Sequence, residues 1–178
     1  MKNKKLKEFL NKTLKEFLNK NKTCRDGYLF ASNLTLEEFL NKCQRGDWIL
    51  WLFAKMNPRS IKELTLAKGH CANTVRHLMT DDESLKAVDT AIAFGEGRAT
   101  RQELEEAAND AQAINSYTAR CADEAAHAAA SWADGPDYAA SWAAEAYTDN
   151  DAEKENQKQT ADICRKYLPI EIWDQSKL

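Results

Sequence analysis

The chain has 178 residues, of which 43% are hydrophobic and 30% charged, and its formal net charge is −3. This composition is typical of a soluble globular protein, and a chain of this length can bury one sizeable core. No apolar run approaches the roughly 18 residues that cross a bilayer, so a membrane-spanning protein is excluded. After Met1, Leu and Phe alternate with Lys, Glu and Asn, so we expect no secretory signal.

Five cysteines are spread widely along the chain, and their number is odd. This pattern favours reduced thiols in a cytosol over a disulfide framework, and no CxxC or HxxxH spacing offers a closed metal site. We therefore expect a cytoplasmic protein that holds no metal ion and no cofactor. The five are Cys24, Cys43, Cys71, Cys121 and Cys164.

An octapeptide recurs near the N-terminus, as KLKEFLNK at 5–12, TLKEFLNK at 13–20 and TLEEFLNK at 35–42. Residues 1–22 hold eight lysines against two glutamates, and apolar residues recur there at spacings of three and four. These features predict a basic amphipathic arm over 1–22 and one domain over 23–178, and we expect deletion of 1–20 to spare the fold. The apolar residues of the arm are Leu6, Phe9, Leu10, Leu14, Phe17 and Leu18.

The basic arm over 1–22 also indicates which partners to expect. Lys and Glu alternate along it, and no aromatic platform for bases accompanies the lysines, so a solvated helix face is favoured over binding to nucleic acid or an anionic membrane. A lone arm would expose six large apolar residues, so it has to pack on its own domain or on a second subunit. We expect a homo-oligomer.

Helix starts and stops alternate along the rest of the chain. Thr35 with Glu38 predicts a capping box before a short helix, and Gly46 separates this helix from one that carries Trp48 and Trp51. The next helix is predicted to have Pro58 in its first turn and to run through Met79. A capping box of Thr80 with Glu83 begins the helix after it, which ends at 95–97, and a box of Thr100 with Glu103 begins another helix.

Residues 100–132 are rich in alanine and contain neither Gly nor Pro. A straight helix of this length would be about 50 Å long, more than a compact domain of this size spans, so we expect a break at Asn115-Ser116. Pro136 opens a helix to about Tyr147, a last helix ends at Tyr167, and the tail docks Ile170, Ile172 and Trp173. The pattern predicts an all-α, single-domain bundle of seven or eight helices with an alanine-rich central helix.

Three groups of residues suggest chemistry. His70 and His77 share a helix face, with Cys71 and Arg76 beside them, and form the best catalytic candidate; structural roles are favoured because no complete triad is evident. The segment GEGR at 95–98 lacks the third glycine of a phosphate-binding loop and has no preceding strand, so a helix C-cap is favoured. The acidic runs are typical of helix first turns and solvated faces, so we expect no metal site.

The aromatic residues have three possible roles: they fill a core, line a cleft for a flat ligand, or anchor a protein interface. Arginines near them in the sequence would complete a cleft for an anionic ligand. The candidate site residues for binding a ligand or partner are Trp48, Trp51, Arg59, His70, Arg76, His77, Arg98, Arg101, Arg120, Trp132 and Trp142.

The sequence resembles a family of helical immunity proteins that are attached to bacterial polymorphic-toxin systems and are common in phage genomes. The resemblance covers roughly residues 35–147 and rests on LAKGHCANTV at 66–75, on AVDTAIAFGEG at 87–97 with the alanine-rich region after it, and on RGDWILWLF at 45–53. It implies an all-helical cytosolic protein that neutralises something by binding it, and it carries no catalytic residues.

Three functions follow in order of preference. The first is a non-enzymatic binding protein of the immunity or anti-defence type, which blocks a toxin or defence effector through an acidic helical surface with aromatic anchors. The second is a phage-type sponge that sequesters a nucleotide-like immune signal in a pocket lined by Trp and Arg. The third is a small enzyme that uses His70, Cys71 and His77.

Overall fold

The computed structural model describes residues 13–111, 117–131, 135–174 and 176 of the chain. For 117–120 and for Ala122, Asp123 and Ala126 it describes the backbone alone. The described residues form ten α-helices and two short 3-10 helices and contain no strand, so the prediction of an all-α, single-domain fold is confirmed.

The helices are α2 (Lys15–Lys20), α3 (Arg25–Ala31), α4 (Leu36–Lys42), α5 (Gly46–Met56), α6 (Ile61–Ala72), η1 (Asn73–Leu78), α7 (Asp82–Gly95), α8 (Arg101–Asp110), α9 (Tyr117–Ala130), α10 (Tyr138–Glu145), α11 (Asn150–Tyr167) and η2 (Ile170–Ile172).

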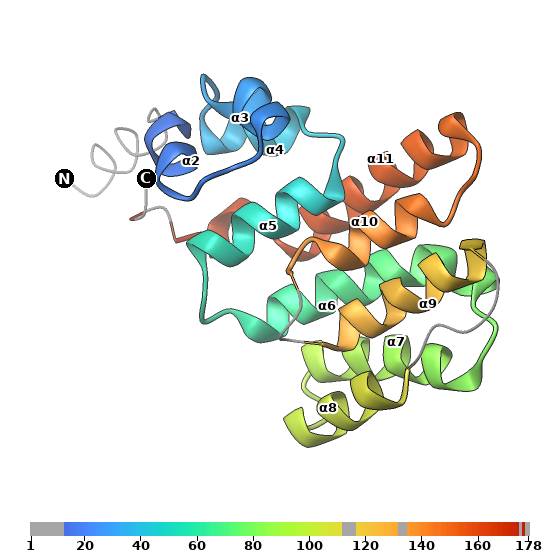
Figure 1. The fold of residues 1–178 in the computed structure, drawn as a ribbon. Helices are drawn as coiled ribbons and strands as arrows, with labels where there is room; N and C mark the ends of the chain where they lie inside the picture. Colours follow the sequence, from blue (N-terminus) through green and yellow to red (C-terminus); the bar gives the residue numbers. More distant parts are fainter. Residues whose placement is uncertain (1–12, 112–116, 132–134, 175, 177–178) are drawn as a thin grey trace.

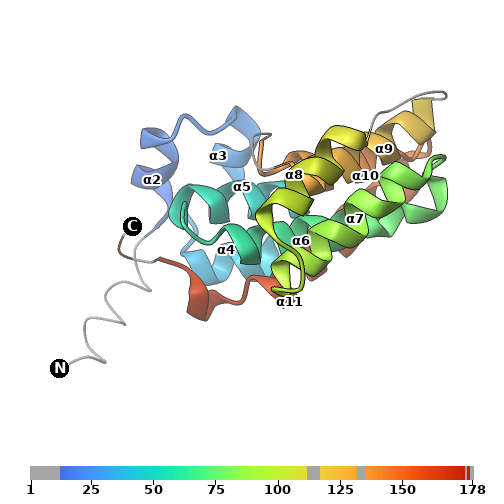
Figure 2. The same cartoon turned by 90° about the horizontal axis from the view of Figure 1, so that it is seen from below.

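Helix α6 lies inside the bundle and contacts α5, α7, α9, α10 and α11 (Figures 1 and 2). The short helices α2, α3 and α4 lie together at one side, and α8 lies at the opposite side against α7 and α9 (Figure 1). The alanine-rich helix α9 contacts the α-helices α6, α7, α8 and α10 and the 3-10 helix η1. Small side chains on several faces allow this close approach.

Two clusters of buried side chains hold the fold together. The leucine–phenylalanine core joins α2, α3, α4, α5 and α11 to one face of α6. Its centre consists of large side chains that are fully or almost fully buried, namely Leu14, Leu36, Phe39, Ile49, Leu50, Leu52, Phe53, Met56 and Leu168. The burial of such side chains contributes roughly 1.5–3 kcal/mol each, so this core supplies much of the stability.

The alanine core joins α7, α8, α9 and α10 to the end of α6. Ten or more of its buried residues are alanines, and its large members are Val75, Val88, Phe94 and Leu104. Because alanine adds little apolar area, this cluster depends on close backbone approach. Gly95 illustrates the point: a Cβ atom at this position would lie 2.4 Å from the Cβ of Leu66.

The second and third octapeptide copies form α2 and α4, and their first residues pair. Thr13 and Thr35 form an antiparallel bridge, and the backbone N–H of Leu14 donates to the carbonyl of Leu34 at 2.9 Å. Equivalent apolar positions of both copies enter the leucine–phenylalanine core. They are Leu14, Phe17 and Leu18 in the second copy and Leu36, Phe39 and Leu40 in the third.

This packing moves the expected boundary at residue 22 toward the N-terminus. Leu14 is fully buried, and Phe17 and Leu18 are nearly so, which makes residues 13–20 part of the domain. The expectation that deletion of 1–20 spares the fold does not fit this packing. The first copy, at 5–12, lies outside the described residues. The three apolar residues of the arm that are described, Leu14, Phe17 and Leu18, pack on their own domain, and the expected homo-oligomer stays a prediction.

Local signals located most helix ends. Both residues of the capping boxes Thr35/Glu38 and Thr100/Glu103 make the expected reciprocal hydrogen bonds. The box of Thr80 with Glu83 was wrong, because Asp81 caps α7 by accepting from the backbone N–H of Ser84 at 2.6 Å.

Two further expectations need correction. Pro58 lies in the turn before α6 and not in its first turn, because Ser60 is the N-cap. The helix expected to run through Met79 ends at Ala72 and continues as the 3-10 helix η1, in which Val75 departs from helical geometry (φ −112°, ψ 15°).

The remaining segments agree with the sequence in outline. The alanine-rich stretch is broken after α8, where Ala111 is extended, while the expected break at 115–116 lies outside the described residues. In the tail, Trp173 is buried and packs edge-on against Phe53 with ring centroids 5.0 Å apart. Ile172 does not dock, since 38% of it is exposed.

Candidate functional site

A pocket of about 300 Å³ lies between the short N-terminal helices and α5. Its lining includes Trp48 and Trp51 from α5, Gly27 of α3 and Cys24, the N-cap residue of α3. The loop before α10 contributes Asp137. We call this site the aromatic pocket. Trp48 and Trp51, which the sequence singled out, therefore share one hollow.

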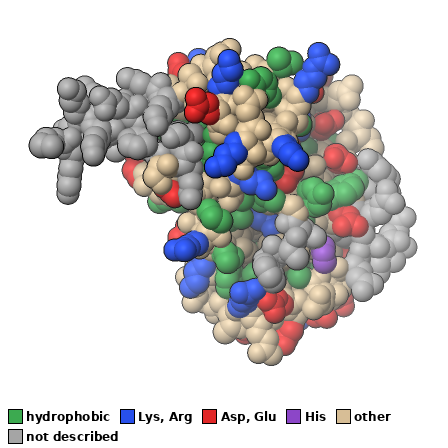
Figure 3. Space-filling model, turned by 60° about the vertical axis from the view of Figure 1, so that its left-hand side comes forward, with side chains coloured by type: hydrophobic (Ala, Val, Ile, Leu, Met, Phe, Trp, Pro, Cys, Tyr) green, Lys and Arg blue, Asp and Glu red, His purple; other side chains and the backbone are tan. Residues whose placement is uncertain are grey.

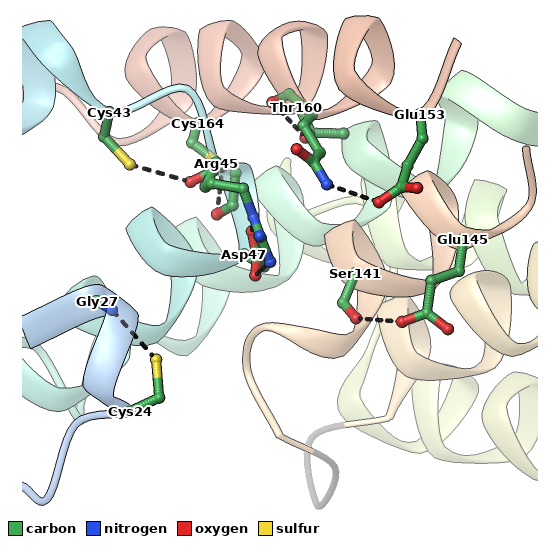
Figure 4. A network of polar contacts seen from close by, with 12 residues as sticks. Cys24, Gly27, Cys43, Arg45, Asp47, Ser141, Glu145, Glu153, Thr160 and Cys164 are labelled. Atoms are coloured by element: carbon green, nitrogen blue, oxygen red, sulfur yellow. Dashed lines mark hydrogen bonds and ion pairs between the residues drawn. The ribbon is translucent and has the colours of Figure 1, made fainter. Parts of the chain in front are cut away.

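The start of α5 places an ion pair in this pocket. Arg45 is extended at the N-cap (φ −122°, ψ 105°), and its guanidinium donates to both carboxylate oxygens of Asp47, at 2.9 and 2.6 Å (Figure 4). The Arg45 Cζ atom also lies 5.0 Å from the centroid of the Trp48 ring, a distance suited to a cation–π contact. Asp47 is almost fully buried, so its charge is balanced by Arg45 and fixed in place.

Glycine at position 46 makes this arrangement possible. A Cβ atom there would lie 2.5 to 2.8 Å from three atoms of Thr160 on α11. Only a residue without a side chain lets the first turn of α5 approach α11 so closely, and this approach sets the position of Arg45 and Asp47.

Asp137 is the second acid of the pocket and has no such partner. It forms no ion pair with any residue that the structure describes. Burial raises the pKa of its carboxyl group, and the negative charge of Asp47 adds to the rise, while its own backbone N–H, Lys68 and Lys55 oppose it. A half-buried carboxyl group beside two indole rings is suited to accept a hydrogen bond from a positively charged group.

Helix α3, which contributes Gly27 and Ala31 to the pocket, also carries exposed apolar side chains. Leu29 of α3 is 65% exposed, and its neighbour Phe30 is 38% exposed. The Phe30 ring contacts the rings of Trp48 and Phe39, with centroids 5.7 and 6.1 Å apart. The pocket and α3 together thus present apolar side chains around a pocket whose charged lining residues are Lys22, Arg45, Asp47 and Asp137.

A second pocket, of about 390 Å³, lies where α6 and α8 begin. Its cations are Arg59 from the loop before α6, Lys62 from the first turn of α6, and Arg101 from the first turn of α8. Phe94 and Leu104 provide apolar lining. We call this site the arginine pocket. It brings together two arginines that lie 42 positions apart in the sequence.

A third, shallower hollow is the acidic groove between α7 and α8, with a volume of about 680 Å³. Asp82, Asp89, Glu103 and Glu106 line it, together with the cations Lys86 and Arg98. Arg98 is paired with Glu96, and Glu103 is held by the capping box with Thr100. These acids lie on other helices than the aromatic pocket, and the expected acidic contact surface stays a prediction.

The histidine and cysteine candidates lie apart from these hollows. The imidazole of His70 stacks on the ring of Tyr167, and the exposed His77 lies in η1. Arg76 makes a two-pronged ion pair with Asp89, at 2.7 and 2.9 Å. The Cys71 thiol is fully buried, 3.8 Å from the sulfur of Cys164, and is thus shielded from any external substrate.

The remaining candidates are Trp142, Trp132 and Arg120. Trp142 is partly buried and packs on the alanine core. Trp132 and the side chain of Arg120 lie outside the described residues. The predicted site residues are thus distributed over two pockets and several surface positions. Among the described residues, no three His, Cys, Asp or Glu side chains are grouped to hold a metal ion.

With this geometry established, the chain was compared with known proteins. No family model, no curated protein and no solved structure matches it. The resemblance to helical immunity proteins therefore stays a prediction. The described helices also include none that is both long and apolar enough to cross a membrane.

Sequence reasoning named Arg59 and Arg101 but missed the charged residues of the aromatic pocket and Lys62 of the arginine pocket. Arg45 and Asp47 are two positions apart, a spacing that carries no helical signal, and Asp137 comes from a loop 90 positions later. Lys62 looked like any solvated lysine. A possible signal for the aromatic pocket was the pair Leu29-Phe30, two large apolar residues in a short helix that needs few of them.

Proposed function

We propose that this protein is a non-enzymatic binding protein of the immunity or anti-defence type, which neutralises a toxin or a defence effector by direct contact. Its contact surface consists of α3 and the aromatic pocket. The observation that carries the proposal is the exposed Phe30 ring in contact with Trp48 of the tryptophan-lined pocket, on a helix whose Leu29 is also exposed.

Exposed apolar side chains around a tryptophan-lined hollow are typical of protein interfaces. Trp, Tyr and Arg dominate the residues whose truncation weakens binding most, and they cluster in pockets that lose water on association. The aromatic pocket offers Trp48, Trp51 and the stacked Arg45 in such an arrangement. Leu29 would lose the largest exposed fraction on contact, since it projects furthest into solvent among the exposed large hydrophobic residues.

The polar lining of the pocket indicates the chemistry of the partner. Arg45 neutralises Asp47, whereas Asp137 has no ion-pair partner among the described residues. A Lys or Arg side chain of the partner could lay its methylene groups on the indole rings and donate its terminal N–H groups to Asp137. The partner is thus a protein that presents a basic side chain within an apolar surface.

Site-specific photo-crosslinking tests the proposal. A photo-reactive phenylalanine derivative at position 29 should give one dominant covalent adduct in cells that naturally contain the chain. Position 172 provides a matched control, because Ile172 is exposed to the same 38% as Phe30 but lies in η2. Position 172 should give no such adduct.

The adduct also has to depend on the pocket and on function. The variant Trp48→Ala should lose it, and cells that carry this variant should lose protection against the captured protein. Equal adducts from positions 29 and 172, or a captured protein that is harmless without this chain, would contradict the proposal.

A further inference from the structure

We propose that the arginine pocket is a binding site for a small organic phosphate, in which a flat ring is joined to the phosphate group. The pocket shares no lining residue with the aromatic pocket. The inference therefore goes beyond the proposed protein contact and does not depend on it.

The first argument is charge. Three cations, Arg59, Lys62 and Arg101, line the pocket against one acid, Glu63. Among the residues that the structure describes, neither Arg59 nor Lys62 forms an ion pair. Arg101 donates to Glu105 at 2.9 Å, so part of its charge is already balanced. A phosphate monoester carries nearly two negative charges at neutral pH and matches two unpaired cations better than a carboxylate does.

The second argument is position, because the cations converge from separate segments. Arg59 lies in the turn between α5 and α6, Lys62 in the first turn of α6, and Arg101 in the first turn of α8. The ammonium group of Lys62 reaches the turn between α7 and α8, since a Cβ atom at Gly97 would lie 3.8 Å from the lysine nitrogen. Cations on three segments can surround one anion, which a row along a single helix cannot do.

The third argument is the apolar part of the pocket. Phe94 and Leu104 are 7% and 1% exposed, and Ile61, at 39%, stands at the margin. Figure 3 shows one face of the molecule, on which Lys and Arg side chains lie among hydrophobic side chains. An inorganic anion would gain nothing from this apolar lining, whereas a flat ring could cover it. The volume of about 390 Å³ is within the range of small-molecule sites.

Calorimetric titration of the full chain with adenosine 5′-monophosphate tests the inference. Adenosine and inorganic phosphate are the two comparison probes, because each supplies one half of the chemistry. We expect the monophosphate to bind more tightly than either half, and its affinity to fall as the salt concentration rises from about 50 to about 300 mM. Equal binding of adenosine, or no binding of the monophosphate at millimolar concentration, would overturn the proposal.

Two double variants locate the site. Arg59→Gln with Lys62→Gln removes two exposed cations and should weaken binding of the monophosphate at least about tenfold, since hydrogen bonds to charged groups are lost. Lys154→Gln with Lys158→Gln removes the same charge from the exposed surface of α11 and should leave the affinity unchanged. Equal losses in both variants would show a general charge effect and no site.

The two proposals fail separately. If the monophosphate does not bind but the crosslink from position 29 forms, the organic phosphate site is rejected and the protein contact stands. If the monophosphate binds the chain and the double variant at 59 and 62 loses this binding, but no crosslink forms from position 29 in a chain with an intact aromatic pocket, the protein contact is rejected and the organic phosphate site stands.

Discussion

The imidazole of His70 lies flat on the phenol ring of Tyr167, with ring centroids 4.1 Å apart and planes inclined by 6°. This contact joins α6 to the last turn of α11 and leaves the imidazole half-buried. Burial lowers the pKa of His70, and the nearby charge of Lys166 adds to this effect, while Glu96 opposes it. The histidine that was the best catalytic candidate thus holds two helices together.

The lowered pKa of His70 predicts how stability depends on pH. In the unfolded chain the imidazole gains its proton near pH 6.5, whereas in the fold it gains it at lower pH. The stability that the neutral imidazole of His70 contributes is therefore fully present above pH 6.5. It is lost as the pH falls from 6.5 through the lowered pKa. We expect the melting temperature to drop in this window, and to drop less in His70→Gln. The exposed His77→Gln should behave as wild type; an equal change in both variants would contradict the assignment.

The ionised carboxyl group of Asp137 should lower the free energy of unfolding. Because burial raises its pKa, the fold favours the neutral acid, and the ionised form is disfavoured above the ordinary pKa of about 3.9. Asp137→Asn should therefore raise the melting temperature at pH 7, and the gain should vanish near pH 3, where both states are protonated. Glu171→Gln, at an exposed acid of η2, should change neither value.

The same substitution links stability to function. If Asp137 serves the partner, Asp137→Asn should weaken the crosslink from position 29 while it stabilises the fold. Such opposition is common at binding sites, where a group is kept at some cost to stability. A variant that is less stable and still crosslinks fully would count against both roles of this residue.

Gly95→Ala should be strongly destabilising. The new Cβ atom would lie 2.4 Å from the Cβ of Leu66 and 2.8 Å from its Cα, so the backbones of α6 and α7 would have to separate. We expect a loss of at least about 1–3 kcal/mol in the free energy of unfolding, measured by urea denaturation. Gly97→Ala provides the comparison, since its Cβ has space and only the positive φ of 78° is strained, at a cost of about 1 kcal/mol. The reverse order would be evidence against close packing of α6 on α7.

Phe17→Ala should be as costly as its counterpart in the third copy. Phe17 and Phe39 are both almost fully buried in the leucine–phenylalanine core, and truncation of a core phenylalanine costs about 3–5 kcal/mol. Deletion of 1–20 should remove at least that much, because Leu14 and Leu18 go with Phe17. Full stability of the chain without residues 1–20 would show that residues 13–20 form an arm separate from the domain.

Short-range chemistry explains where sequence reasoning succeeded. A capping box needs only two residues three positions apart, so Thr35 and Thr100 could be found, and Gly95 marked the end of α7. The same reasoning failed at Thr80, because Asp81 is an equally good cap and Ser84 was within its reach. It failed at Leu14 because a buried and an exposed amphipathic helix have the same periodicity.

The pockets could be predicted only in part, since they depend on tertiary contacts. Trp48 and Trp51 lie on one helix, so their proximity followed from the sequence. The approach of Asp137 to Asp47, and of Arg59 to Arg101, depends on how α10 and α8 pack, and no spacing encodes it. The sequence predicted one cleft lined by both Trp and Arg, but the structure has two pockets. Arg59 and Arg101 lie near the starts of α6 and α8, away from the tryptophans of α5.

Alkylation of the cysteines can report which part of the fold opens. Cys24 is exposed, whereas Cys43, Cys71 and Cys164 lie in the leucine–phenylalanine core and Cys121 in the alanine core. Burial raises the pKa of the Cys43 thiol to about 12 and raises that of Cys164, so these sulfurs resist alkylation while the fold is closed. Under mild alkylation, one label should appear at once. Later labels, located by mass spectrometry, would show which half of the molecule opens first and how often it does so.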